Sequence, residues 1–304
     1  MTLREQTPVP KPSALFSPAM SSTDSGPAQQ TPSPVPVRSP NRNAGTDPST
    51  DSDETATRDS KKSFSQPKLR LEVRDLDHPG SSKFLGAINI STVFSDAVNN
   101  VLRLLYLSPS DRHTTPPPTR SVTLILRDMD GVAYTTGTDL DDDHKEIHFS
   151  LKYISSISPA SRLAHEITGV LTHELVHCYQ WNAKNTCPGG LIEGIADWVR
   201  LHCDLSPPHW KKETTGRWDK GYQHTAYFLE YLEVRFGEGT VRRLNEKLRQ
   251  NKYNVETFWV ELLGSSVDEL YGDYVEKSKP DDDKNRDKPD KPSPSKTVDE
   301  ATQT

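Results

Sequence analysis

The chain has 304 residues and a formal net charge of −6 at pH 7, with 32% hydrophobic and 26% charged residues. This length suits one or two domains, and an acidic chain without a dense basic block argues against nucleic acid as a partner. The sequence contains no run of 18 apolar residues, so we expect no transmembrane helix.

The two ends of the chain differ in composition from its middle. The first part is rich in Pro, Ser, Thr and Asp, as in TPSPVPVRSP (31–40), and the last part is charged and lacks large apolar side chains. Neither end can bury enough apolar surface to offset the entropy of ordering it. We therefore expect disordered tails over 1–67 and 278–304, and one domain over 68–277.

The opening residues and the cysteines bear on the compartment. MTLREQTPVPKPSALFSP lacks a continuous apolar segment, so we expect no secretory signal and, by default, an intracellular protein. Three cysteines, Cys178, Cys187 and Cys203, do not make a disulfide framework. We expect them to be reduced thiols.

The domain begins with alternating and helical patterns. KLRLEVRDL (68–76) alternates apolar and polar residues, as a half-buried strand does. Apolar residues then recur at helical spacing in ISTVFSDAVNNVLRLLYL (90–107), and Ser91 or Thr92 could cap the start of that helix.

The next segment predicts further strands. Alternation in SVTLIL (121–126), followed by the turn pair Asp130-Gly131, predicts a hairpin. LDDDHKE (140–146) has the composition of an acidic surface loop, and EIHFSLKYI (146–154) alternates like another strand.

Helical patterns dominate the rest of the domain. Residues 158–182 predict one long helix, capped by Ser158 or Ser161 with Pro159 in its first turn. Further helices are expected over 191–202, 221–237, 239–250, 255–264 and 266–277. Strands followed by helices indicate an α+β fold.

HELVH at residues 173–177 is the first chemical motif. Residues four apart on a helix share a face, with Cβ atoms about 5–6 Å apart, so His173 and His177 can share one tetrahedral metal ion. Glu174 lies one step round the helix, where it can act as general base on an attacking water. This pattern is typical of zinc hydrolases, although five residues alone are only moderately specific.

A catalytic zinc ion also needs a third protein ligand. Glu193 follows His177 by sixteen positions, on the next predicted helix and after a Gly-Gly turn. Asp197 lies four residues later on the same face, which suits an outer carboxylate that fixes a histidine tautomer. We expect Glu193 to be the ligand, and Asp197 stays open as the alternative.

In a metal-free interpretation, the two histidines lie on the polar face of their helix, and Glu193 and Asp197 are exposed to solvent. The surrounding segments are apolar all round, and unpaired buried acids there would cost several kcal/mol. The sequence therefore favours a metal site. We expect His165 to be structural or exposed, and Cys178 to be a small core residue.

The segments THELVHCYQW, GGLIEGIADWVRL and GYQHTAYFLEYLE resemble the plant basic secretory protein family, zinc-dependent peptidases of plants, fungi and bacteria. The resemblance covers about residues 69–276. It implies a zincin-like fold with a twisted N-terminal sheet, an active-site helix below it and a helical C-terminal half. It also implies that His173 and His177 are zinc ligands, that Glu174 is catalytic and that Glu193 takes the third-ligand place.

Two features of this chain depart from that family's name. The name says basic and secretory, whereas this chain is acidic and we expect no signal. The departure bears on compartment and substrate and leaves the chemistry unchanged.

Two further elements could serve catalysis. Tyr222 follows a glycine at a predicted helix start, where it could donate a hydrogen bond to a developing oxyanion, with His224 as second choice and structural packing of Tyr222 as the alternative. The 146–154 strand could be an edge on which an extended peptide lies.

Together these observations predict a monomeric, zinc-dependent metallopeptidase that acts on peptide or protein substrates, with Glu174 as general base. One alternative is a binding or scaffold protein with a structural or vestigial zinc site. The other is a zinc hydrolase that does not act on peptides.

Overall fold

The computed structural model describes residues 63–138 and 140–279, so the expected tails lie almost wholly outside the described residues. The elements in chain order are β1 (Lys68–Val73), α1 (Pro79–Ala87), α2 (Ile90–Tyr106), β2 (Ser121–Arg127), β3 (Ala133–Thr138), β4 (Asp141–Ser150), α3 (Leu151–Ser156), the 3₁₀ turn η1 (Ala160–Arg162), α4 (Leu163–Tyr179), α5 (Gly189–His202), α6 (Tyr222–Phe236), α7 (Thr240–Gln250), α8 (Val255–Leu263) and α9 (Val267–Ser278). This is an α+β fold, as the sequence predicts.

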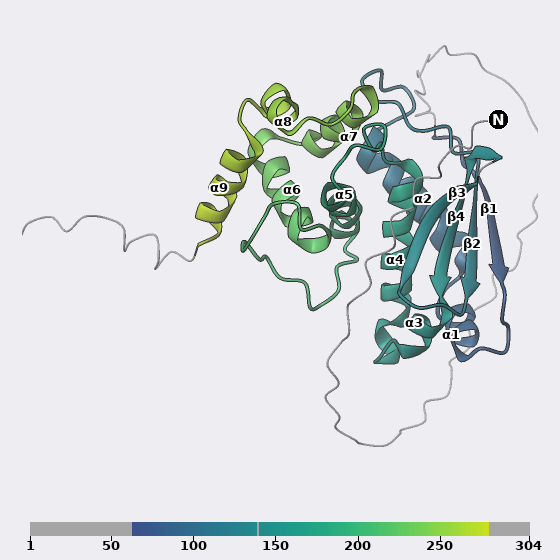
Figure 1. Cartoon of the computed structure of the whole chain (residues 1–304). Helices are drawn as coiled ribbons and strands as arrows, with labels where there is room; N and C mark the ends of the chain where they lie inside the picture. The colour runs from purple at the N-terminus through teal and green to yellow at the C-terminus, as the bar shows by residue number, and fades with distance from the viewer. Residues whose placement is uncertain (1–62, 139, 280–304) are drawn as a thin grey trace, which may run out of the picture. The chain divides into compact units, whose positions relative to one another are not determined.

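The sheet has the strand order β1-β2-β4-β3 (Figure 1). β1, β2 and β4 are parallel, and β3 runs antiparallel to β4. The predicted hairpin between β2 and β3 is therefore wrong, because β4 lies between them. β2 is buried along almost its whole length, which suits a central strand, whereas β3 is short and alternately exposed, which suits an edge.

Two expectations for the segment that forms β4 are also wrong. The strand begins at Asp141, so most of the expected acidic loop is part of it. It ends at Ser150, whose hydroxyl accepts a hydrogen bond from the backbone N–H of Tyr153 and caps α3. The strand is also internal, so among the described residues the edge of the sheet on this side is β3.

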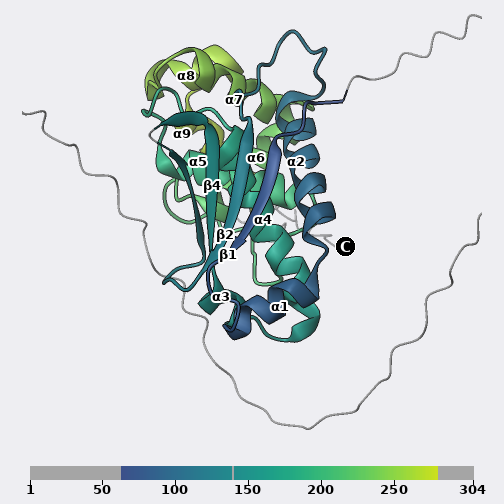
Figure 2. The ribbon, with the colours of Figure 1, turned by 90° about the vertical axis from the view of Figure 1, so that its right-hand side faces the viewer.

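Helices α2 and α4 cover one face of the sheet and lie behind it in Figure 2. α2 begins after Asn89 without a side-chain cap, so the caps expected from Ser91 or Thr92 are wrong. The helix expected from residue 158 is divided, because the 3₁₀ turn η1 precedes α4 and neither expected serine caps it. α4 is buried on nearly every side, because the sheet lies on one flank and α5 packs on another.

The remaining helices form a second layer beyond α4 (Figure 1), and their bounds lie within two residues of the predicted ones. Their core is aromatic, with edge-to-face and tilted contacts among Trp218, Phe228, Trp259, Tyr271 and Tyr274. Within residues 63–138 and 140–279, every helix is too short or too polar to cross a lipid bilayer. The three cysteines are free thiols.

Candidate metal centre

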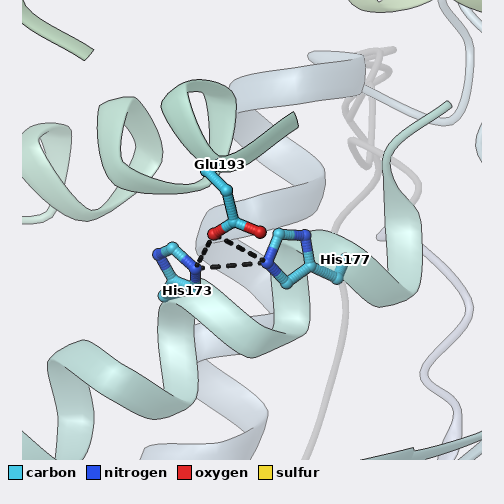
Figure 3. Close-up of side chains that lie close together, drawn as sticks. All are labelled: His173, His177 and Glu193. Atoms are coloured by element: carbon cyan, nitrogen blue, oxygen red, sulfur yellow. Dashed lines mark hydrogen bonds and ion pairs between the residues drawn. The ribbon is translucent and has the colours of Figure 1, made fainter. Parts of the chain in front are cut away.

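Two neighbouring helices bring three side chains to one point. α4 carries His173 and His177 one turn apart, and α5 carries Glu193 on the side that packs against α4. The three side chains point toward one another in Figure 3. Their nitrogen and carboxylate atoms all lie within 4.8 Å of one another, and they are the group of possible metal ligands found in the described part of the chain.

The spacing of these atoms fits a tetrahedral ion. Nε2 of His173 lies 3.1 Å from Nε2 of His177 and 3.0 Å from Oε2 of Glu193, and the remaining separation, between His177 and Glu193, is 3.7 Å. Two ligand atoms at about 2.1 Å from a tetrahedral zinc ion lie about 3.4 Å apart. Two imidazoles and a carboxylate are also donors that zinc accepts. The residues present therefore fit a zinc ion.

The charges of the cluster favour an ionised carboxylate. Burial alone would raise the pKa of Glu193, but hydrogen bonds with His173 and His177 hold it well below its ordinary value. Burial alone would likewise lower the pKa of His173, yet the carboxylates of Asp197 and Glu193 outweigh it and raise that pKa to about 10. The anionic surroundings attract a cation to this point.

Asp197 lies behind His173 and away from the cluster. Nδ1 of His173 donates to Oδ1 of Asp197 over 2.7 Å, and both side chains are buried. This contact places a proton of His173 on Nδ1 and leaves Nε2 facing His177 and Glu193. Among the two acids of α5, Glu193 therefore faces the cluster and Asp197 contacts the far side of the imidazole.

Glu174 is held from the sheet. The hydroxyl of Thr135, on the edge strand β3, lies 2.7 Å from Oε2 of Glu174 and 2.9 Å from its backbone carbonyl. Glu174 is buried, and its charge acts on His173 and Tyr222 of the same site. Because Thr135 restrains the carboxylate, the glutamate has a fixed orientation next to the cluster.

Tyr222 lies over the same cluster. Its ring stacks on His173 with 6.1 Å between centroids and 15° between planes, and it is 48% exposed. Gly221 and Tyr222 both have positive φ, 86° and 47°, and this backbone turn directs the ring toward the site. Burial, followed by the charge of the nearby carboxylates, raises the pKa of Tyr222 to about 12, so the phenol is a neutral donor at pH 7.

Three other residues singled out in the sequence lie elsewhere. His224 is buried and contacts the carbonyl of Arg217 and the hydroxyl of Tyr271, so it does not join the cluster. His165 contacts the carbonyl of Asp204. Cys178 is buried in the core, where burial raises its pKa above the ordinary value, which keeps it protonated.

A buried ion pair joins the two helices that carry the site. Arg200 of α5 donates to Glu166 of α4 over 3.2 Å, and both side chains are less than one-tenth exposed. Gly169 makes room for the guanidinium, because a Cβ there would lie 2.6 Å from Nε of Arg200. Burial alone would raise the pKa of Glu166, but Arg200 holds it below the ordinary 4.5. The pair therefore contributes only while the carboxylate is ionised.

The start of α5 also approaches the loop before α6 very closely. A Cβ at Gly190 would lie 1.8 Å from the carbonyl oxygen of Asp219. The absent side chain lets α5 sit against the backbone that leads to Gly221 and Tyr222. Glu193 and Tyr222 therefore belong to two segments in direct backbone contact.

Two residues at the site were missed from the sequence. Gln180 follows His177 by three positions, and its amide lies 2.6 Å from Nδ1 of that histidine; the i, i+3 spacing could have indicated it. Thr135 had no such signal, because its contact with Glu174 depends on the position of β3 in the sheet.

Fold and site together define an α+β protein with a candidate His-His-Glu metal centre and an adjacent buried glutamate. The chain matches the family model described as BSP, a peptidase of plants and bacteria, over residues 66–274. The match covers more than half of the chain, and the chain belongs to this family, which confirms the resemblance seen in its motifs. No curated protein and no solved structure matched the chain.

Proposed function

We propose that this protein is a zinc-dependent metallopeptidase of the HExxH type, with a zincin-like catalytic domain over residues 68–277 that acts as a monomer on peptide or protein substrates. The observation that carries the proposal is the convergence of His173, His177 and Glu193 with separations that suit one tetrahedral ion. Membership of a peptidase family supports the substrate class.

In this proposal each side chain has one task. His173, His177 and Glu193 hold the ion, and Asp197 fixes the tautomer of His173. A bound zinc ion supplies Lewis-acid polarisation of the scissile carbonyl and lowers the pKa of water. Glu174 accepts a proton from the attacking water and delivers it to the leaving amine, in the orientation that Thr135 restrains.

Tyr222 and β3 act on the substrate. The neutral phenol of Tyr222 donates a hydrogen bond to the oxyanion that develops on the scissile carbonyl. An extended peptide adds to the free edge of β3, the strand that contacts Glu174, by the backbone pairing that sheet edges offer. Tyr222→Phe with full activity and bound zinc would exclude the proposed donor.

The test separates metal from chemistry. Glu174→Gln in the full chain should retain zinc by elemental analysis and lose about 10²–10⁴-fold in cleavage of a peptide library, because the base is gone and the ligands remain. The exposed Glu238→Gln is the matched control and should cleave like the wild type. A zinc-loaded wild type that cleaves no peptide would contradict the proposed peptidase activity and favour a binding or scaffold protein with a structural zinc site.

A further inference from the structure

His177 presents its two ring nitrogens to different surroundings. Nε2 lies 3.1 Å from Nε2 of His173 and 3.7 Å from Oε2 of Glu193, inside the cluster. Nδ1 lies on the opposite side of the ring, 2.6 Å from Nε2 of Gln180. Gln180 can place either an N–H donor or an oxygen acceptor against Nδ1. This choice determines which nitrogen of His177 carries the proton.

The protonation that suits metal binding fixes the kind of partner needed. An imidazole that binds an ion through Nε2 carries its proton on Nδ1, which then has to donate a hydrogen bond. A glutamine carboxamide has a donor end and an acceptor end that a half-turn exchanges. At Gln180 the nitrogen lies against Nδ1, while Oε1 is buried without a hydrogen-bond partner.

We propose that Gln180 is the positioning residue of His177, and that in the metal-binding arrangement its carboxamide is turned so that Oε1 accepts the Nδ1 proton. The half-turn gives Oε1 a partner in the Nδ1 proton and moves the amide nitrogen to the buried position that Oε1 occupies in this structure. The inference rests on the proposed zinc site. It gives each histidine ligand an acceptor of its own, Asp197 for His173 and Gln180 for His177.

The backbone of Gln180 fits this role. It forms the C-cap of α4, and its N–H donates to the carbonyl of Val176 over 2.7 Å, so the start of the side chain is fixed relative to His177. The carboxamide has one hydrogen-bond partner among the described residues, and that partner is His177. A purely structural glutamine would use its amide to join other segments of the chain.

The two acceptors differ in charge, and this predicts an unequal pair of ligands. A carboxylate behind an imidazole raises its basicity as a ligand more than a neutral amide does. His177, backed by Gln180, is then the weaker donor of the two. Replacement of Gln180 by Glu should make the two histidines alike and hold zinc at least as tightly as the wild type.

The experiment measures zinc affinity on the full chain by competition with a chelator, independently of any cleavage. Gln180→Met keeps the length of the side chain and removes the acceptor, so zinc should bind about 10–100-fold more weakly. Gln180→Glu should restore wild-type affinity or exceed it. Gln250→Met, at an exposed position of α7, makes the same exchange away from the site and should change nothing.

A second readout reports the proton itself. In the zinc-loaded wild type, nitrogen-15 NMR of the imidazoles should show the Nδ1–H of His177 protected from exchange with water, and this signal should be lost in Gln180→Met and return in Gln180→Glu. Equal zinc affinity and an unchanged signal in Gln180→Met would overturn the role of Gln180 alone. A wild type that takes up no zinc would overturn both this inference and the proposed function. If Gln180→Met does not fold, weaker zinc binding by Gln180→Glu than by the wild type decides against it.

Discussion

The sheet and the helical layer approach the same helix, α4, from different sides and restrain different groups on it. From the sheet, Thr135 of β3 restrains the carboxylate of Glu174. From the helical layer, α5 supplies Glu193 to the cluster and Asp197 to the back of His173. Under the proposed function, the sheet thus positions the base and the helical layer holds the metal, so the two tasks can be disturbed separately.

The largest expected effect comes from breaking the contact that joins the two helices of the site. Arg200→Met removes the buried guanidinium partner of Glu166 and leaves it with Arg162 and the hydroxyl of Tyr153, so it should lower the free energy of unfolding by about 1.5–3 kcal/mol in urea titrations at pH 7. Glu166→Gln combined with Arg200→Met should recover part of the loss, because no charge is then stranded.

The pH dependence of this pair has a definite sign. Arg200 depresses the pKa of Glu166 in the folded state, so the stabilisation is complete above the ordinary value of 4.5 and is lost as the pH falls through the lower folded-state value. The difference between wild type and Arg200→Met should therefore shrink in acid. A difference that stays constant from pH 7 to pH 3 would contradict the ionic origin of the effect.

A smaller effect is expected in the helical layer, and it should fall on the metal. Asp197→Asn keeps the shape of the side chain but removes the charge behind His173 and lets an amide N–H face Nδ1, so zinc affinity should drop about 10–100-fold. Chelator competition measures this directly. If Asp197→Asn leaves zinc affinity unchanged but lowers cleavage, the proposal that the helical layer holds the metal and the sheet positions the base is wrong.

The smallest effect is expected on the sheet side, and it should fall on the rate. Thr135→Val removes the hydroxyl that restrains Glu174 and should lower kcat about tenfold, the equivalent of about 1.4 kcal/mol, with zinc content unchanged. Thr135→Ser retains a hydroxyl and serves as the matched control. Loss of zinc from Thr135→Val would show that the sheet also contributes to metal binding, against the proposed separation of the two tasks.

The helical layer was the more predictable part from sequence. Helix spacing is local, so apolar periodicity and glycines such as Gly237 located α5 to α9 to within two residues. The predicted helices over α4 and α5 then carried the three candidate metal ligands. The prediction of the metal centre depended on these two helices, which follow each other in sequence and pack together, and the three side chains meet at that contact.

The sheet was less predictable, because strand order depends on contacts distant in sequence. The turn at Gly131 is present, with φ of 83°, yet the strand after it pairs with β4 and not with β2. Alternation in residues 146–154 likewise concealed the change from strand to helix at Ser150. Thr135 could not be linked to Glu174 before the position of β3 was known.

The close approach at Gly190 bears on how this protein can change over evolutionary time. Any replacement there adds at least a Cβ, which would meet the carbonyl oxygen of Asp219 at 1.8 Å, so a substitution requires α5 or the loop that carries Asp219 to move. On the other side of α4, β3 is the edge strand of the sheet among the described residues, and its side chains are partly or fully exposed. Under the proposed function, substrate preference can therefore change by gradual steps along β3, while Gly190 stays as it is.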